Sequence, residues 1–109
     1  MASLSRRLFT DVHGTPRSPE WPRVRAAHLR AHPTCAACGR TKGAQVHHVR
    51  PFHLAPALEL DPANLMTLCE GRVFGRHHLE VGHSGSWQRT NTRARADAAA
   101  MLAAAKPRP

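Results

Sequence analysis

Val-His-His-Val-Arg-Pro at residues 46–51 carries two adjacent histidines, His47 and His48, between valines. The apolar pattern predicts a short strand over residues 45–49. Neighbouring side chains of an ideal strand point to opposite faces, so each histidine is expected to serve a different part of any shared site. An imidazole can bind a metal ion or take a proton from water near neutral pH, and phosphodiester hydrolysis needs both roles. A single histidine beside a core strand is more often structural, but a pair linked to a cysteine cluster favours a reactive site.

Three cysteines surround this stretch: Cys35 and Cys38 form a Cys-x-x-Cys turn before it, and Cys69 follows it. Two thiolates at this spacing suit one tetrahedral zinc ion. A structural site needs two more ligands, which Cys69 and one of the adjacent His77 and His78 would supply. The alternative is a redox Cys-x-x-Cys pair with Cys69 as a buried apolar residue. We favour zinc because nine histidines accompany the cysteines and metal-coupled folding would stabilise a thin core.

Two other zinc-binding classes do not fit the spacing. A finger with two cysteines and two histidines expects about twelve residues between its second cysteine and its first histidine, whereas His47 follows Cys38 after only eight. A zinc deaminase needs His-x-Glu upstream of its cysteines, because the glutamate moves the proton. The histidines upstream of Cys35 have no glutamate at that position; they are His13, His28 and His32.

The chain is short, basic and poor in aromatic side chains. Its 109 residues predict one domain, and 5% aromatic residues with no tyrosine leave few large side chains for the core. A structural metal commonly stabilises so small a core. The net charge is +9, and fourteen of the sixteen Lys and Arg residues are arginine, which suits phosphate. This balance favours a nucleic-acid partner, although codon bias in a GC-rich genome would also enrich arginine.

Targeting signals are not evident in the sequence. No apolar run is long enough to span a bilayer, and no apolar segment follows Arg6 and Arg7 as a secretory signal would require. Three cysteines are an odd count, which argues against a disulfide framework. We therefore expect a protein of the reducing cytoplasm.

The composition divides the chain into three parts. We predict a flexible basic arm over residues 1–17, a folded domain over 18–90, and an Ala/Arg-rich helix and tail over 91–109. The alanine-rich face of the last helix, residues 92–105, is expected to pack on the domain or on a second copy.

Within the folded domain, Ser18 has the character of a helix N-cap, with a proline and an acidic residue after it. Apolar spacing predicts that this helix runs to His32, the residue before a proline. The elements expected after the first strand are a structured loop over 50–62, a second strand or short helical entry over 61–69, and the start of a helix over 77–81.

Several ordered motifs together resemble the HNH endonucleases over residues 18–87. They include His-His-x-x-Pro-Phe-His at 47–53, Leu-Glu-Leu-Asp-Pro-x-Asn-Leu at 58–65 and Gly-His-x-Gly-x-Trp at 82–87. This pattern resembles the stand-alone phage and bacterial type that has a Cys-x-x-Cys zinc site. The resemblance implies an α+β fold of the ββα-metal (His-Me finger) kind, in which two strands and a helix surround one divalent ion, with flanking helices and a structural zinc site.

The resemblance also implies an endonuclease that hydrolyses DNA phosphodiester bonds, here with low sequence specificity because no base-reading motif is evident. His47 and His78 would hold the catalytic divalent ion (Mg²⁺, Mn²⁺ or Ni²⁺), and His83 would add a third ligand or contact phosphate. His48 would be the general base. Asn64 would tie the adjoining loop together and help orient that base.

The expected zinc site departs from the family pattern at one position. Members with this site usually have Cys-His where this chain has His77-His78. We infer that His77 replaces the fourth thiolate, which gives the ordinary ligand set Cys35, Cys38, Cys69 and His77. Residues 70–76 form a longer spacer than in many members, and His53 receives no role.

Four arginines near these motifs are candidates for contact with the DNA backbone, or for a solvated rim: Arg50, Arg72, Arg76 and Arg89. The rival function is a non-catalytic zinc module that binds DNA. Such a module would have no use for the paired histidines, so we prefer the enzyme, which has base, orienting group and metal ligands. The motifs leave open a phage packaging, restriction or toxin setting, with the partners each implies, and the oligomeric state.

Overall fold

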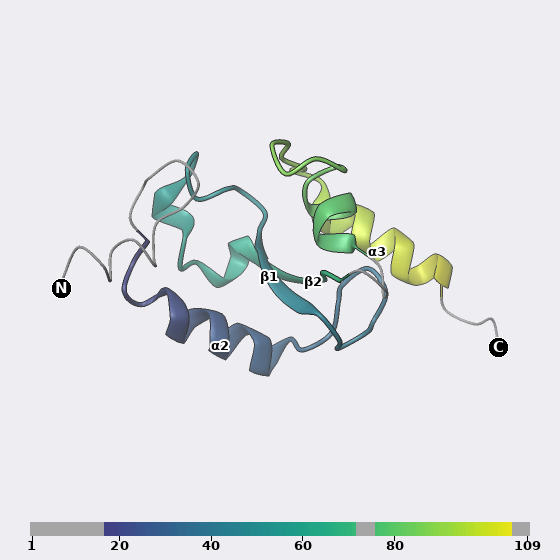
Figure 1. The fold of residues 1–109 in the computed structure, drawn as a ribbon, viewed down its shortest axis with the longest axis horizontal. Coiled ribbons are helices and arrows are strands. Elements are labelled where there is room, and N and C mark those ends of the chain that lie inside the picture. Colours follow the sequence, from purple (N-terminus) through teal and green to yellow (C-terminus); the bar gives the residue numbers. More distant parts are fainter. Residues whose placement is uncertain (1–16, 72–75, 106–109) are drawn as a thin grey trace.

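The computed structural model describes residues 17–71 and 76–105. Two short strands lie at the middle of the fold, with helical segments on both sides (Figure 1). This small α+β arrangement confirms the predicted fold class. The elements in chain order are α2 (Trp21–Ala31), β1 (Ala44–His48), η1 (Pro56–Leu58), η2 (Pro62–Asn64), β2 (Leu65–Cys69), η3 (His78–Gly82) and α3 (Ala94–Ala105).

The two strands form one antiparallel pair in which Ala44 lies opposite Cys69 and His48 lies opposite Leu65. Helix α2 packs against β1, whereas the wide helical turn η3 packs against both strands. Helix α3 packs in turn on η3. Every residue of β2 is buried, which follows from cover on both faces of so narrow a sheet.

The core is small and includes two of the three cysteines. Leu68 and Cys69 are fully buried, and Cys35 is nearly so. Around them pack Met66 and Val81, with small alanines from the Cys-x-x-Cys turn and from α3. Few large apolar side chains contribute, as the composition predicts. The buried cysteines make up part of the core itself.

Helix α2 begins two residues later than predicted. The Ser18 hydroxyl does not cap the helix: it accepts a hydrogen bond from the Glu20 backbone N–H at 3.1 Å and so closes a turn before it. Glu20 occupies the N-cap position without a side-chain cap. The predicted end is correct, since the helix stops at Ala31 and His32 caps it, immediately before a proline.

The remaining elements follow the sequence patterns closely. Strand β1 begins one residue earlier than predicted, at Ala44. Both alternatives for residues 61–69 occur in succession, because the single turn η2 leads directly into β2. The face of α3 that carries Ala94 and Ala98 is buried within this chain, so the helix packs on its own domain.

The predicted basic arm, apart from Arg17, and the last four residues of the predicted tail lie outside the described residues. The three-part division of the chain remains a prediction. In the described part of the chain, no helix combines the length and the apolar character needed to cross a membrane.

Candidate functional site

The four residues predicted to bind zinc converge on one point. Their ligand atoms, from Cys35, Cys38, Cys69 and His77, all lie within 4.8 Å of one another. His77 Nδ1 is 3.2 Å from Cys69 Sγ and 3.7 Å from Cys35 Sγ, and the Sγ atoms of Cys38 and Cys69 are 3.9 Å apart. Ligand atoms of a tetrahedral zinc ion lie about 3.5 to 3.8 Å apart at the usual bond lengths. The cluster is therefore compatible with a structural zinc site.

The electrostatics of the thiols call for a cation. Burial and the neighbouring charge of Cys35 raise the pKa of Cys69 to about 12. Burial also opposes ionisation of Cys35, but backbone hydrogen bonds, first from Ala37, outweigh it and lower the pKa of that thiol. Three thiolates cannot share this volume without positive charge among them, and a zinc ion would supply it.

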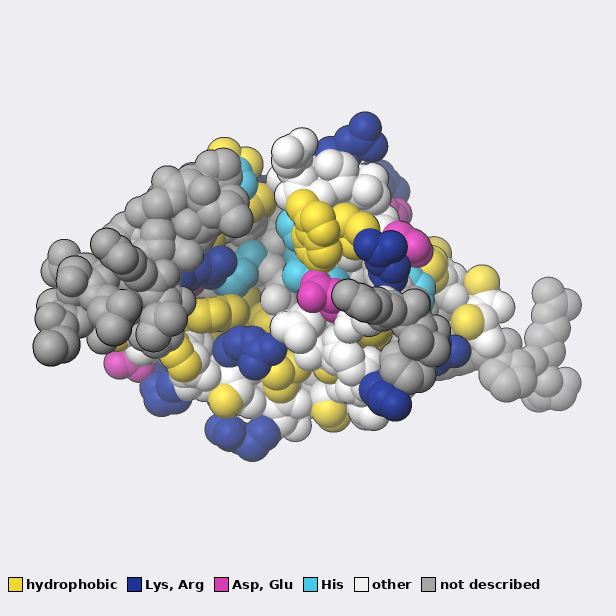
Figure 2. All heavy atoms as spheres, viewed as in Figure 1, with side chains coloured by type: hydrophobic (Ala, Val, Ile, Leu, Met, Phe, Trp, Pro, Cys, Tyr) yellow, Lys and Arg dark blue, Asp and Glu magenta, His cyan; other side chains and the backbone are white. Residues whose placement is uncertain are grey.

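A second cluster contains only histidines. Ligand atoms of His47, His78 and His83 all lie within 4.8 Å of one another. The ring centroids are 4.9 to 5.1 Å apart, and the rings meet at steep angles rather than stacking. Strand β1 contributes His47, whereas η3 and its C-cap contribute the other two. In Figure 2, histidine side chains gather in a hollow near the middle of the face shown, with hydrophobic side chains beside them.

In two of the three rings, a hydrogen bond at Nδ1 leaves one nitrogen for a ligand. His78 Nδ1 pairs with Glu70 Oε1 at 2.8 Å, and His83 Nδ1 donates to the Arg89 carbonyl at 2.9 Å. Each contact leaves Nε2 as the available nitrogen. Among the described residues, the buried His47 Nε2 has no hydrogen-bond partner. A buried nitrogen without a partner is costly, and a metal ion bound by the three Nε2 atoms would satisfy it.

Two histidines of this cluster, His47 and His78, are held in the neutral form that binds metal. Burial, followed by the charges of His78 and His83, lowers the pKa of His47 to about 3. Burial also lowers the pKa of His78, although Glu70 opposes the shift. Neutral imidazoles at pH 7 keep their lone pairs for coordination. The pairing of His78 with a carboxylate is a common way of orienting a metal-binding histidine.

Gly82 allows the His47 ring to lie where it does. A Cβ at this position would come within 2.9 Å of His47 Cε1 and 3.1 Å of Nε2. We expect Gly82→Ala to displace the His47 ring. The affinity of the three clustered histidines for Mn²⁺ or Ni²⁺ should then fall by about 10- to 100-fold, as it does on loss of a supporting contact in metal sites. Calorimetric titration of the zinc-loaded protein measures this. The zinc content of the same variant is the control, because Gly82→Ala changes none of the four residues of the cysteine cluster. Wild-type affinity for the divalent ion in folded Gly82→Ala would contradict the expectation.

His48 points to a different part of the site from His47, as predicted for neighbours on a strand. Its Nε2 lies 2.9 Å from the Glu59 carbonyl oxygen, and its ring lies 4.5 Å from that of Trp21. Since a carbonyl only accepts, Nε2 carries the proton and Nδ1 the lone pair. Burial is the main cause that lowers the pKa of His48 to about 4, with the charges of Arg17 and His78 adding to it. The ring is therefore neutral at pH 7.

Asn64 ties the loop between the strands to β1. Its Oδ1 accepts from the Arg50 backbone N–H at 2.8 Å, and its Nδ2 donates to the carbonyls of Arg50 and Leu58 at 3.1 and 3.3 Å. Leu58 precedes Glu59, whose carbonyl contacts His48. Asn64 thus holds the segment whose carbonyl contacts His48, and its role in orienting a general base stays a prediction.

The predicted DNA contacts are less clustered. Arg50, Arg76 and Arg89 are exposed, and one Arg89 nitrogen donates to the Ser84 carbonyl at 3.5 Å. Arg72 lies outside the described residues. His53 is exposed and belongs to neither histidine nor cysteine cluster.

Four side chains near the site escaped prediction: Trp21, Glu59, Glu70 and Trp87. Trp87 is 53% exposed, and its ring lies 5.1 Å from His78 and 5.0 Å from His83. The Gly-His-x-Gly-x-Trp motif contains Trp87 and was a signal for it, but the other three carry no sequence feature that separates them from structural residues.

Comparison with known protein families agrees with this geometry. Residues 35–71 match the HNH endonuclease family. The match spans about a third of the chain, and it confirms the resemblance inferred from the motifs. No curated protein and no solved structure gives a significant match.

The HNH segment, residues 35–71, contains the three cysteines, His47 and His48, and Asn64. It ends before His77, His78 and His83. The tertiary structure brings these later histidines to the cysteines and to His47. The roles assigned to individual site residues remain predictions, and the grouping of the side chains supports them.

Proposed function

We propose that this protein is a metal-dependent endonuclease that hydrolyses DNA phosphodiester bonds, with His48 as the general base. The observation that supports this most directly is the triad of His47, His78 and His83 beside a neutral His48, within a fold whose central segment matches the HNH family. A divalent ion bound by the triad would polarise the phosphate and stabilise charge on the leaving oxygen. The cluster of three thiols and His77 would hold a structural zinc ion.

The residues of the chain divide the remaining work among them. His48 Nδ1 takes a proton from water, which attacks phosphorus, while the Glu59 carbonyl keeps the Nε2 proton in place. Glu70 and the Arg89 carbonyl hold His78 and His83 in orientation. The exposed arginines and the net charge of +9 favour binding of the sugar–phosphate backbone.

The alternative is a zinc module that binds DNA without cleaving it. That function would need the cysteine cluster and the charge, but it gives no reason for a buried His47 Nε2 without a partner among the described residues. It also gives no reason for two further histidines directed at the same point. These observations favour the enzyme.

Cleavage of supercoiled plasmid tests the proposal. Protein freed of loosely bound metal but still loaded with zinc would be incubated with plasmid alone and with Mg²⁺, Mn²⁺ or Ni²⁺. We expect nicked and then linear DNA only where the divalent ion is added. DNA binding without cleavage in every metal would instead establish the non-catalytic module.

Trp87 is expected to contribute to substrate binding, because an exposed indole beside the triad offers a surface for a base or sugar. Loss of one such contact costs about 1 kcal/mol or more, which is at least roughly a fivefold loss of affinity. We expect that loss in Trp87→Ala and much less in Trp87→Phe, since the ring is retained. Fluorescence anisotropy of labelled DNA, measured in a His48→Ala background to prevent cleavage, would show it. Equal binding by the alanine and phenylalanine variants would remove Trp87 from the interface.

A further inference from the structure

Glu59 is a carboxylate in an unexpected place. Its exposed fraction is only 4%, and a buried carboxylate is destabilising unless hydrogen bonds or a cation compensate it. The Ser18 backbone N–H lies 3.1 and 3.2 Å from its two oxygens. The Arg17 guanidinium lies 3.7 Å from Oε2. The Glu59 side chain is thereby tied to the segment that precedes helix α2, and this segment lies on the side of Glu59 away from His48.

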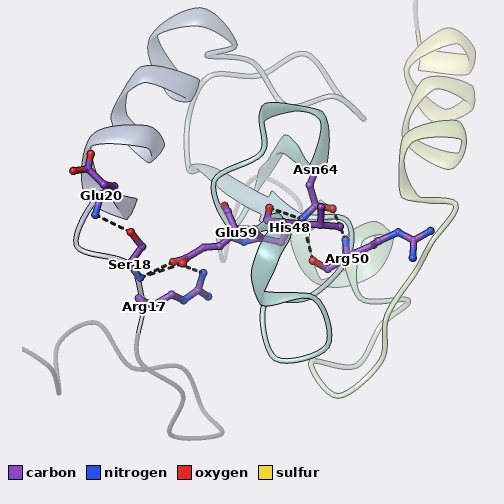
Figure 3. A network of polar contacts seen from close by, with 8 residues as sticks. Arg17, Ser18, Glu20, His48, Arg50, Glu59 and Asn64 are labelled. Atoms are coloured by element: carbon purple, nitrogen blue, oxygen red, sulfur yellow. Dashed lines mark hydrogen bonds and ion pairs between the residues drawn. The ribbon is translucent and has the colours of Figure 1, made fainter.

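The backbone of the same residue contacts the base. The Glu59 carbonyl accepts the His48 Nε2 hydrogen bond, so the position of residue 59 sets which nitrogen of His48 carries the proton. Figure 3 shows Glu59 between His48 on one side and Arg17 and Ser18 on the other. Residue 59 lies between the single turns η1 and η2, and Asn64 holds the neighbouring Leu58 from one side. The carboxylate of Glu59 fixes residue 59 from the other side, through the segment before α2.

A second set of contacts connects the Arg17–Glu59 ion pair with His48. The Arg17 guanidinium lies over the Phe52 ring at 4.5 Å and over the Trp21 ring at 5.5 Å. Trp21 in turn packs against the His48 ring. Arg17 therefore supports both the carbonyl that binds His48 and the indole that packs on it.

We propose that Glu59 is a positioning residue for the general base: its carboxylate, held by Ser18 and Arg17, keeps its own carbonyl on His48 Nε2. This inference rests on the proposed function, in which His48 is the base. It assigns the segment before α2 a role in catalysis that does not involve contact with the substrate. It also gives a reason for burying a charged side chain at position 59, where an apolar side chain would pack without needing a hydrogen bond or an ion pair.

The test compares Glu59→Ala and Glu59→Gln with Glu20→Gln. Glu20 is the matched control, because its side chain is exposed and pairs only with Arg23 among the described residues. Two quantities are measured on the zinc-loaded protein: kcat and KM for DNA cleavage, and the ¹⁵N spectrum of the His48 imidazole, assigned by comparison with His48→Ala. The spectrum separates a protonated from an unprotonated nitrogen.

In Glu59→Ala we expect kcat to fall about 10- to 100-fold with little change in KM, as for the loss of other orienting contacts. His48 should change from a single Nε2–H tautomer to a mixture. Glu59→Gln should restore part of both, because the amide oxygen still accepts from Ser18, and Glu20→Gln should match the wild type. A wild-type tautomer and kcat in both Glu59 variants would overturn the inference.

The spectroscopic measurement separates this inference from the proposed function. If the wild-type protein cleaves no DNA, the nuclease proposal fails, yet the tautomer of His48 still shows whether Glu59 positions it. If Glu59→Ala does not fold, Glu59→Gln and Arg17→Met carry the test, since both keep the bulk of the side chain. An unchanged His48 tautomer in these two variants would then overturn the inference.

Discussion

Cysteine replacement at Cys69 is expected to unfold the domain. Cys69 is fully buried, and its Sγ lies close to both Cys38 Sγ and His77 Nδ1, so Cys69→Ser removes a ligand at the centre of the core. Structural zinc sites contribute on the order of 10 kcal/mol to folding, whereas a small domain has a net stability of about 5 to 15 kcal/mol. Loss of the ion therefore removes most or all of the stability.

Three measurements check this expectation. Zinc content should fall by one equivalent per chain, circular dichroism should show loss of helix, and thermal unfolding should lose its cooperative transition. His47→Ala is the control, because it removes a ligand of the histidine triad and leaves the cysteine cluster complete. A cooperative transition with retained secondary structure in metal-free Cys69→Ser would show that the cluster is not needed for folding. It would revive the interpretation of Cys-x-x-Cys as a redox pair.

Replacement of His48 is expected to slow cleavage strongly without affecting the fold. A positioned general base contributes about 10²- to 10⁴-fold to the rate. His48 is a neutral histidine next to the triad, belongs to neither of the two clusters found among the described residues, and is oriented by a backbone carbonyl. His48→Ala should lower kcat by that factor. Zinc content, affinity for the divalent ion and DNA binding should stay as in the wild type, because the ring belongs to none of those sites.

The matched control for this variant is His32→Ala. His32 is an exposed histidine at the end of α2, and the contact that it makes with Thr67 uses its backbone carbonyl, which the substitution keeps. Its kcat should equal that of the wild type. Cleavage by His48→Ala at the rate of His32→Ala would remove His48 from the mechanism, while leaving the metal triad as the site to be tested next.

Much of the site could be predicted from local patterns. Cys-x-x-Cys with a third cysteine indicates zinc because two thiolates at that spacing reach one ion without help from the rest of the chain. Adjacent histidines on a strand point apart for a reason intrinsic to the backbone, and the structure shows His47 in the triad and His48 on the Glu59 carbonyl. The role of Asn64 as the tie of the loop also followed from its motif.

Other features depended on how distant segments meet. The start of α2 was predicted too early because Ser18 is engaged in a turn and donates its backbone N–H to Glu59, a partner 41 residues away. Glu59 itself looked like an ordinary surface glutamate, since no local pattern shows that a loop residue will be buried against the segment before a helix. The same holds for Trp21, because the apolar spacing that predicts the helix does not show that this side chain contacts His48.

The sequence alone was sufficient for the class of fold, for a cysteine cluster compatible with zinc and for the family resemblance, because each depends on residue types at short and fixed spacing. Spacing alone left both His77 and His78 open as the zinc ligand, and the family resemblance assigned His77 to zinc and His78 to the divalent ion. The grouping of the side chains agrees with that assignment, but its physical reason lies in the tertiary structure. Where the chain enters η3, the two side chains leave the backbone in different directions, and the packing of η3 against both strands directs His77 to the thiols and His78 to His47 and His83.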